Sequence, residues 1–390
     1  MQFIDLTAQQ QRIRAKIEAN IQAVLSHGQY IMGPEIQELE ERLSSYVSVK
    51  HAIACSSGTD ALLLALMAYG VGQGDAIFTT PFTFIATAEV ISLLGAIPIF
   101  VDIDPKTFNI NPKSLDQAIT ALKSNDPGLH PLPSTMSNEL SALNPRGIIS
   151  VDLFGLPADY DRINTIAKKH GLFVIQDAAQ SFGAEYKAKK ACSLASIGCT
   201  SFFPAKPLGC YGDGGMCFTD NDDLTDTMRS LRNHGGGNHK YDNVRIGING
   251  RMDTLQAAIL LAKFDIFPEE IELRNQVASK YNKLVSVFSP ELSAPQVPPG
   301  LRSVWAQYSI LAKDEEHRSA IQDSLKKKGI PTAIYYPKPL HLQDAFTYLG
   351  YKEGDFPVSE SASHRIVSLP MHPYLKEEEQ QQIIDLIKVM

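Results

Sequence analysis

The sequence lacks any long hydrophobic run. Its longest uninterrupted apolar stretch spans residues 61–69, whereas a transmembrane helix needs about 20 apolar residues. The first residues, MQFIDLTAQQQRIRAK, also lack the basic start and apolar core of a secretory signal. We therefore expect no membrane-spanning segment and a cytoplasmic protein.

Cysteine is scarce and is not spaced for metal binding. The five cysteines are odd in number and show neither CxxC nor Cys/His ligand spacing. They are Cys55, Cys192, Cys199, Cys210 and Cys217. This pattern favours buried, reduced thiols, so no disulfide and no metal site is predicted.

Positive charge is not concentrated in any segment. The formal net charge is −7, from 36 Lys+Arg and 43 Asp+Glu, with no extended Lys/Arg run. Because nucleic-acid binding needs a clustered basic face, no nucleic-acid partner is expected. A small anionic ligand remains possible, since it interacts only with its own pocket. No P-loop signature occurs, and the glycines of residues 70–75 lack GxGxxG spacing, so they predict a turn.

What the sequence does contain is an alternation of short apolar runs and helical stretches. The predicted strands are residues 52–55, 76–79, 97–101, 148–153, 172–175, 198–203 and 216–218. Strands that alternate with helices predict an α/β fold with a mostly parallel mixed sheet flanked by helices. The length of 390 residues fits two domains. We expect a large α/β domain over residues 1–265, with two leading helices that can reach the small domain, and a smaller α+β domain over residues 266–390.

One segment interrupts this rhythm. Residues 123–146, KSNDPGLHPLPSTMSNELSALNPR, contain four prolines and several serine and asparagine residues. Such a composition predicts a surface loop inserted before a strand.

The first candidate for chemistry is AIACSSGTDALLLAL, residues 52–66. A predicted strand runs through Ser57, Gly58 and Thr59 directly into a helix, so the first-turn N–H groups lie at the carboxyl edge of the sheet. That arrangement favours a phosphate. Equally, Ser57 or Thr59 could simply cap the helix while Gly58 makes the turn.

Two further segments end predicted strands. In LFVIQDAAQ, Asp177 closes a strand where α/β folds place ligands, and it could hold a cation or a protonated ring nitrogen. It could also be a helix N-cap. In TSFFPAKPLGCYGDGG, Lys206 lies in a turn between two prolines. A poorly solvated lysine is a candidate Schiff-base former, although most turn lysines are surface residues.

Taken together, the three segments indicate one cofactor. An anion cradle, a strand-end carboxylate and a constrained amine match what pyridoxal 5'-phosphate requires. Each of the three segments alone can be explained without a ligand, whereas the three segments together point to this cofactor.

The sequence also resembles a known family. GTDALLLAL, TPFTFIATAEV, PIFVDID, QDAAQSFGA, SFFPAKPLGCYGDGG, LRNHG and GINGRMDTLQAA are similar, in order, to the motifs of the DegT-type sugar-nucleotide aminotransferases. The resemblance covers nearly the whole chain. It implies the fold type I architecture of pyridoxal phosphate enzymes, with a large and a small domain, and transaminase activity.

The resemblance assigns roles to residues. It implies that Lys206 is the Schiff-base lysine and acid/base catalyst, that Asp177 pairs with the pyridine nitrogen, and that Gln180 contacts the ring hydroxyl. The remaining implied cofactor residues are Gly58, Thr59 and Ser201 at the phosphate, Phe84 on the ring face with Phe82 as the alternative, and Asn249 from a partner subunit. Shared active sites of this kind imply a homodimer.

Substrate residues follow from the same resemblance. Residues 203–215 and 368–375 are most similar to members that aminate UDP-2-acetamido-2-deoxy-3-oxo-glucuronate with L-glutamate, releasing 2-oxoglutarate, for lipopolysaccharide O-antigen synthesis. Arg251 is a candidate carboxylate clamp or an interface brace, and His234, His341 and Tyr336 are candidate sugar contacts.

Three alternatives stay open at this point. The first is an aminotransferase acting on another 3-keto or a 4-keto-6-deoxy dTDP-, UDP- or GDP-sugar. The second is a related dehydratase, in which histidine replaces the lysine, and Lys206 argues against it. The third is a noncatalytic nucleotide-sugar sensor.

Overall fold

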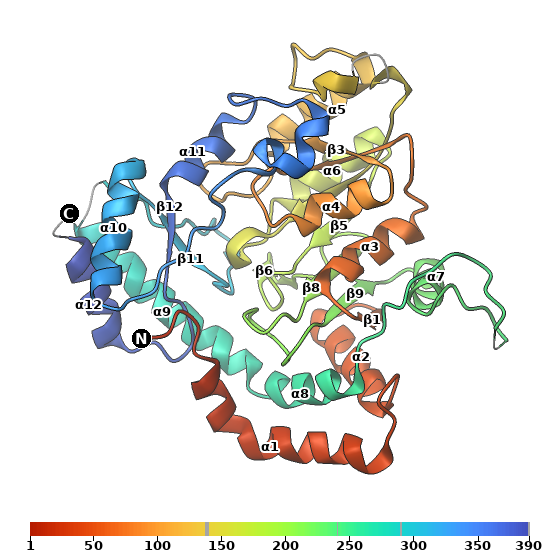
Figure 1. Ribbon diagram of the computed structural model, residues 1–390, viewed down its shortest axis with the longest axis horizontal. Coiled ribbons are helices and arrows are strands. Elements are labelled where there is room, and N and C mark those ends of the chain that lie inside the picture. Colours follow the sequence, from red (N-terminus) through yellow and green to blue (C-terminus); the bar gives the residue numbers. More distant parts are fainter. Residues whose placement is uncertain (137–139, 240, 289–290, 389–390) are drawn as a thin grey trace.

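The computed structural model describes residues 1–136, 140–239, 241–288 and 291–388, and it is built around one large sheet (Figure 1). Seven strands pair in the order β1-β9-β8-β5-β4-β2-β3. They are β1 (His51–Cys55), β2 (Asp75–Thr79), β3 (Ile97–Phe100), β4 (Asn144–Val151), β5 (Phe173–Asp177), β8 (Ile197–Ser201) and β9 (Gly215–Thr219). Neighbouring strands are parallel except where β9 pairs with β1 and β8. All seven predicted strands therefore form, in one mixed sheet.

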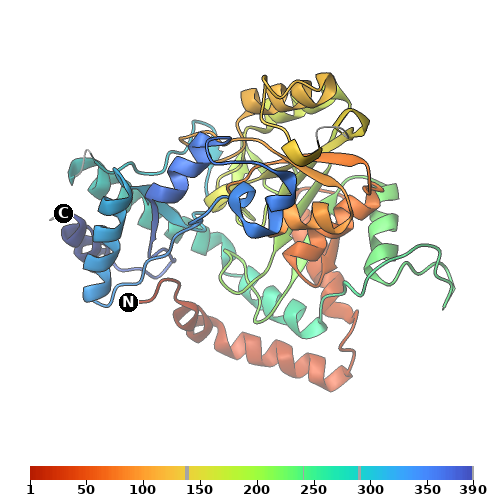
Figure 2. The same cartoon turned by 45° about the horizontal axis from the view of Figure 1, so that its top comes forward.

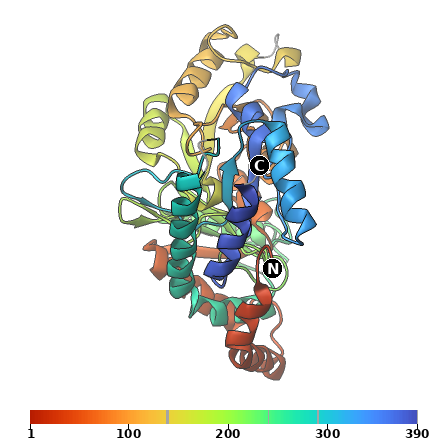
Figure 3. The same ribbon diagram turned by 90° about the vertical axis from the view of Figure 1, so that its left-hand side faces the viewer.

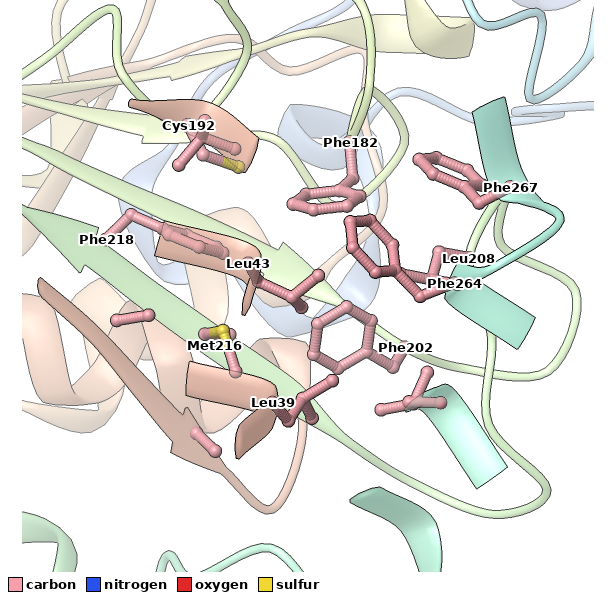
Figure 4. Close-up of a cluster of buried hydrophobic side chains, with 14 of the residues drawn as sticks. Leu39, Leu43, Phe182, Cys192, Phe202, Leu208, Met216, Phe218, Phe264 and Phe267 are labelled. Carbon is pink, nitrogen blue, oxygen red and sulfur yellow. The ribbon is translucent and has the colours of Figure 1, made fainter. Parts of the chain in front are cut away.

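Helices cover both faces of this sheet, because both faces of its strands are apolar. In β1, Ala52 and Ala54 pack in one cluster with α2 (Pro34–Val47) and α8 (Thr254–Phe264), whereas Ile53 and Cys55 pack in another with α3 (Gly58–Ala68). Figure 4 shows the first cluster, in which several phenylalanine rings meet. The helices are α1 (Leu6–His27), α2 (Pro34–Val47), α3 (Gly58–Ala68), α4 (Ala86–Leu93), α5 (Pro112–Ser124), α6 (Tyr160–His170), α7 (Asp222–Arg232) and α8 (Thr254–Phe264).

The C-terminal part has its own apolar cluster, drawn from residues 277–387. It contains α9 (Phe267–Phe288), α10 (Glu315–Lys327) and α12 (Glu377–Ile387), around the antiparallel pair β11 (Tyr308–Leu311) and β12 (Ile366–Leu369), while α11 (Pro357–Arg365) precedes β12. Helix α12 lies beside α9 (Figure 3). This separate cluster supports a division between α8 and α9, near residue 265, which stays a prediction.

The N-terminus joins the two parts. Ile13 and Ile17 of α1 pack on Ile259 and Ala262 of α8, so most of α1 lies against the large part. Ahead of the helix, the carbonyl of Phe3 accepts a hydrogen bond from Met371 N at 3.1 Å, and Figure 2 shows this end of the chain beside the C-terminal helices. Within α1, Gln9 donates to Glu270 and Arg12 pairs with Glu269, both on α9, so the start of the helix also contacts the small part.

Residues 123–146 are more than the surface loop that their composition predicts. Three-residue 3₁₀ helices form at η1 (Ser134–Met136) and η2 (Leu140–Ala142), and residues 137–139 lie outside the described part. His130 is buried, with Nε2 2.8 Å from the carbonyl of Phe100. Ser134 and Thr135 donate to carbonyls beside η5 (Asp344–Leu349). The segment therefore docks on the body of the protein through its buried and hydrogen-bonded residues.

The remaining short elements complete the fold. They are the three-stranded sheet of β6 (Glu185–Tyr186), β7 (Lys189–Lys190) and β10 (Leu301–Arg302), and the 3₁₀ helices η3 (Leu153–Gly155) and η4 (Leu340–Leu342). In the described ranges, no helix combines the length and apolarity that crossing a bilayer requires. Nor do the residues described here include a His, Cys, Asp or Glu group placed to hold a metal ion.

Candidate active site

A cradle for an anion forms where β1 runs into α3. Ser57 caps the helix by accepting from Asp60 N at 3.0 Å, and α3 begins at Gly58. A Cβ on Gly58 would lie 2.6 Å from the Cβ of Ser201, so only glycine allows this approach to the end of β8. The first-turn N–H groups of a helix have no intrahelical partners and favour an anion. The cap predicted for Ser57 is therefore present, and the anion cradle stays a prediction that these N–H groups support.

Asp177 ends β5 and is 5% exposed. Its Oδ2 accepts from Thr87 Oγ1 at 2.8 Å and its Oδ1 from Ala179 N at 3.1 Å. Burial raises the pKa of this carboxyl, and the hydrogen bonds from Thr87 and Ala179 and the charge of Lys206 oppose that rise. No α-helix follows directly, so Asp177 is not the helix cap that the alternative required. Thr87 was not singled out from the sequence, although it lies in the TPFTFIATAEV motif.

Lys206 lies in a tight turn after β8. Its N–H donates to the carbonyl of Phe203 at 2.8 Å, and Cys210 N donates to the carbonyl of Phe202 at 2.8 Å. A Cβ on Gly209 would lie 2.6 Å from two carbonyl oxygens of the turn, so the chain needs glycine there. The side chain is half-buried, and desolvation lowers the pKa of its amine while the charge of Asp177 opposes that shift. Partial burial and a lowered amine pKa support the prediction that Lys206 is more than a surface lysine.

Gln180 links the sheet edge at which Asp177 lies to the C-terminal part of the chain. Its Oε1 accepts from Phe154 N at 2.8 Å, and its Nε2 donates to the hydroxyl of Tyr336 at 3.2 Å. Burial raises the pKa of the Tyr336 phenol. Tyr336, one of the predicted substrate residues, therefore lies against a predicted cofactor residue.

The two phenylalanines of the TPFTF motif have different surroundings. Phe82 is fully buried, with its ring centroid 6.2 Å from those of Phe108 and Tyr336. Phe84 is 55% exposed, and its carbonyl accepts from the N–H of Thr87, the residue that binds Asp177. Of the two rings, only that of Phe84 is exposed. This exposure supports the prediction that Phe84 covers the cofactor.

Asn249 and Arg251 lie beside the cradle. The carbonyl of Gly250 accepts from Ser56 N at 2.9 Å, and Ser56, Asn249 and Arg251 line one hollow. Arg251 donates from one guanidinium nitrogen to Asn233 Oδ1 at 2.5 Å, whereas its Nε is buried and has no partner in the described part. One guanidinium nitrogen of Arg251 is therefore held by Asn233, whereas Nε makes no hydrogen bond in the described part.

The two candidate histidines differ in position. His234 is exposed at the start of the loop after α7, with a left-handed backbone (φ 57°). His341 is 1% exposed, with Nε2 2.9 Å from Glu360 and its ring against Phe356. This burial favours a structural role for His341 over a sugar contact.

Asp152 is a residue that sequence reasoning missed. It follows β4, and its N–H donates to the carbonyl of Asp177 at 3.0 Å. Its fully buried carboxylate accepts from Gln176 and Ser181 at 2.7 Å each and from Tyr160 at 2.8 Å. Burial raises its pKa to about 6. The signal available in the sequence was an aspartate at the end of the predicted strand 148–153.

We expect Asp152→Asn to change how stability depends on pH. Because the pKa of Asp152 is higher in the fold than its ordinary value, its contribution to stability is full in acid and is lost as pH rises through about 6. The wild type should therefore lose roughly 1 kcal/mol relative to the asparagine variant between pH 5 and pH 8. Urea unfolding at both pH values measures this difference, and equal pH slopes for the two proteins would contradict it.

Comparison with known proteins decides the family. The profile of the DegT/DnrJ/EryC1/StrS aminotransferases matches residues 11–388. The chain belongs to this family. This aminotransferase is 48% identical over 375 residues, 96% of each chain, to the UDP-2-acetamido-2-deoxy-3-oxo-D-glucuronate aminotransferase of Pseudomonas aeruginosa. It is also 41% identical over 386 residues, 99% of this chain and 97% of the other, to a Geobacillus stearothermophilus protein named pleiotropic regulatory protein.

Solved structures agree. A DegT DnrJ EryC1 StrS aminotransferase from Brucella abortus superposes with a TM-score of 0.92 at 48% identity, covering 100% of this chain and 99% of that one. NtdA of Bacillus subtilis with the bound cofactor PMP gives a TM-score of 0.85 at 28% identity, covering 99% and 82%. The fold is that of the pyridoxal phosphate aminotransferases, as predicted.

The cofactor of this aminotransferase is pyridoxal phosphate. The residues at the sheet edge fit that group: a cradle at Gly58 that a Cβ would fill, a buried carboxylate at Asp177 and an amine of lowered pKa at Lys206. When bound, pyridoxal phosphate supplies an electron sink for the carbon that loses its proton.

Proposed function

We propose that this aminotransferase transfers the amino group of L-glutamate to UDP-2-acetamido-2-deoxy-3-oxo-glucuronate, giving the 3-amino sugar and 2-oxoglutarate. The observation that carries the proposal is the meeting of Gly58, Asp177 and Lys206 at one sheet edge, in a chain so similar to the Pseudomonas enzyme. The reaction would take place in the cytoplasm and serve lipopolysaccharide O-antigen synthesis.

Lys206 and Asp177 would perform the central chemistry. Lys206 Nζ would hold the cofactor and would move a proton at the substrate carbon. Its lowered pKa increases the fraction of neutral amine that can accept that proton. The Asp177 carboxylate, buried and held by Thr87, keeps the ring nitrogen protonated by charge pairing.

The other cofactor residues would orient the group. The N–H groups at Gly58 and Thr59, with the Ser201 hydroxyl, hold the phosphate, and the Gln180 amide meets the ring hydroxyl. Phe84 covers one ring face. Because these residues lie on α3, on β8, in the turn after β5 and, for Phe84, between β2 and α4, their positions are set by the packed sheet.

We also propose a homodimer with shared active sites, in which Asn249 of one subunit completes the phosphate site of the other. Residues 233–239 and 241–248, which follow α7, project from the body in both Figure 1 and Figure 2. The apolar residues Val244 and Ile246 among them are 57% and 89% exposed. Exposed apolar side chains on a projecting loop favour burial against a second copy.

Other functions have less support. An aminotransferase for another 3-keto or a 4-keto-6-deoxy nucleotide sugar would use the same cofactor residues, so the substrate test below distinguishes it. A noncatalytic sensor would not need Lys206 with a lowered amine pKa facing Asp177.

The test uses the holoenzyme in two steps. L-Glutamate should convert the bound cofactor to its amino form, seen by loss of the aldehyde-form absorption, with stoichiometric release of 2-oxoglutarate. The 3-keto uronate should then restore the absorption. Restoration by a 4-keto-6-deoxy sugar nucleotide and not by the 3-keto uronate would overturn the substrate assignment, and no reaction with any amino donor would support the sensor.

Arg251 should distinguish the uronate from neutral sugars. Its guanidinium lines the hollow beside the cradle, which supports charge-assisted hydrogen bonds to a carboxylate. We expect Arg251→Ala to lower kcat/KM for the 3-keto uronate about tenfold to a hundredfold while cofactor affinity changes little. Arg251→Lys is the matched control, since it keeps the charge and loses the planar fork. Equal losses of uronate use and cofactor affinity in Arg251→Ala would contradict the role.

A further inference from the structure

Lys263 is a buried lysine that the reaction as described does not use. It lies near the end of α8, is 1% exposed, and follows six buried apolar residues of the same helix, 257–262. A buried ammonium is strongly unfavourable unless it has partners, so its contacts identify what holds it there.

Those contacts are with the turn that bears Lys206. Lys263 Nζ donates to the carbonyl of Gly209 at 2.5 Å and lies 4.5 Å from the ring centroid of Tyr211. The nearby Glu270 carboxylate is bound by Gln9 and Tyr374. Among the described residues, Lys263 thus forms its hydrogen bond and its cation–π contact with this turn alone.

A second side chain of α8 binds the same turn. Gln256 accepts from Tyr211 N at 2.9 Å and donates to the carbonyl of Tyr211 at 3.4 Å. Residues seven apart lie on one face of a helix, so Gln256 and Lys263 reach the turn side by side. On its other side the turn is anchored by Phe202 and Leu208, which enter the apolar cluster of Figure 4.

We propose that Lys263 is a positioning residue, whose ammonium fixes the turn at Gly209 and thereby aims the amine of Lys206 at the cofactor. The proposal rests on the proposed role of Lys206. Gly209 lies three residues beyond Lys206. Because the ring of the intervening Pro207 fixes φ, the position of Gly209 constrains the position of Lys206. Losing the ammonium removes the hydrogen bond to Gly209 and the cation–π contact with Tyr211, and it leaves the two hydrogen bonds between Gln256 and Tyr211.

The charge of Lys263 is also sensitive to pH. Burial lowers its pKa to about 8, and the groups that face it are Glu270 on α9 and Cys210 and Tyr211 on the turn. Above that pH the neutral amine donates a weaker hydrogen bond to Gly209. The rate at which Lys206 captures the cofactor should therefore respond to pH through the turn as well as through Lys206.

The test compares Lys263→Met, which keeps the chain length without the charge, with Lys263→Arg and with Leu260→Met, a fully buried control on α8. Amide hydrogen exchange of the apoenzyme should be about tenfold faster over residues 202–211 in Lys263→Met and unchanged in β5. The rate of pyridoxal phosphate capture by the apoenzyme, followed by absorbance, should fall at least about tenfold. Lys263→Arg should stay within about threefold of the wild type.

The outcomes separate the possibilities. Unchanged exchange over the turn, or unchanged capture despite faster exchange, would overturn the proposal. So would losses in Lys263→Met no larger than those in Leu260→Met. Neither measurement uses a sugar substrate, so failure of the substrate assignment would leave this test intact, whereas capture by Lys206→Ala at the wild-type rate would refute the role of Lys206 itself.

Discussion

Lys206→Ala should abolish turnover and leave the fold intact. The variant loses both the amine that holds the cofactor and the group that moves the proton, so we expect kcat to fall by about 10⁴-fold or more. The half-buried side chain makes no hydrogen bond or ion pair in the described part, so its removal should change the melting temperature by only a few degrees.

A matched lysine gives the control. Lys187 lies in the turn between β6 and β7 and pairs with Asp161, outside the sheet edge that carries the site. Lys187→Ala should keep wild-type turnover. Transaminase activity of Lys206→Ala within about a hundredfold of the wild type would contradict the assignment of this lysine.

Asp177→Asn should have the second largest effect. The amide keeps the size of the side chain and can still accept from Thr87 or Ala179, but it has no negative charge to keep the ring nitrogen protonated. We expect the rate of the half-reaction with L-glutamate to fall about a thousandfold, with a smaller loss of cofactor affinity. Stopped-flow absorbance measures the rate, and equilibrium titration of the apoenzyme measures the affinity.

Asp159→Asn is the control for this variant. Asp159 also follows a strand and a turn, and it caps α6 by accepting from Arg162 N. Because asparagine caps a helix about as well as aspartate, its replacement should change stability by less than about 1 kcal/mol and leave the half-reaction rate unchanged. Rates for Asp177→Asn within threefold of the wild type would remove Asp177 from the mechanism.

Local patterns predicted most of the sheet. Apolar runs of strand length, separated by helical stretches, placed all seven strands, because burial on both faces leaves a signal in the composition of each strand. The same patterns predicted Gly58, Asp177 and Lys206 at the ends of their strands, and parallel strands bring such ends to one edge. The interpretation of residues 123–146 as a surface loop missed their contacts with the body of the protein. His130 and Ser134 bind Phe100 and Gly350, which are distant from them in the sequence.

What the sequence determined by itself is therefore the fold class, the family and the three segments on which the chemistry depends, since these are carried by neighbouring residues. Tertiary structure alone decided which side chains meet across the fold: Thr87 on Asp177, Tyr336 on Gln180, and Lys263 on Gly209. Each of these contacts joins residues that are dozens to more than a hundred positions apart. Their geometry depends on how helices pack on the sheet, which the local periodicity of the sequence does not predict.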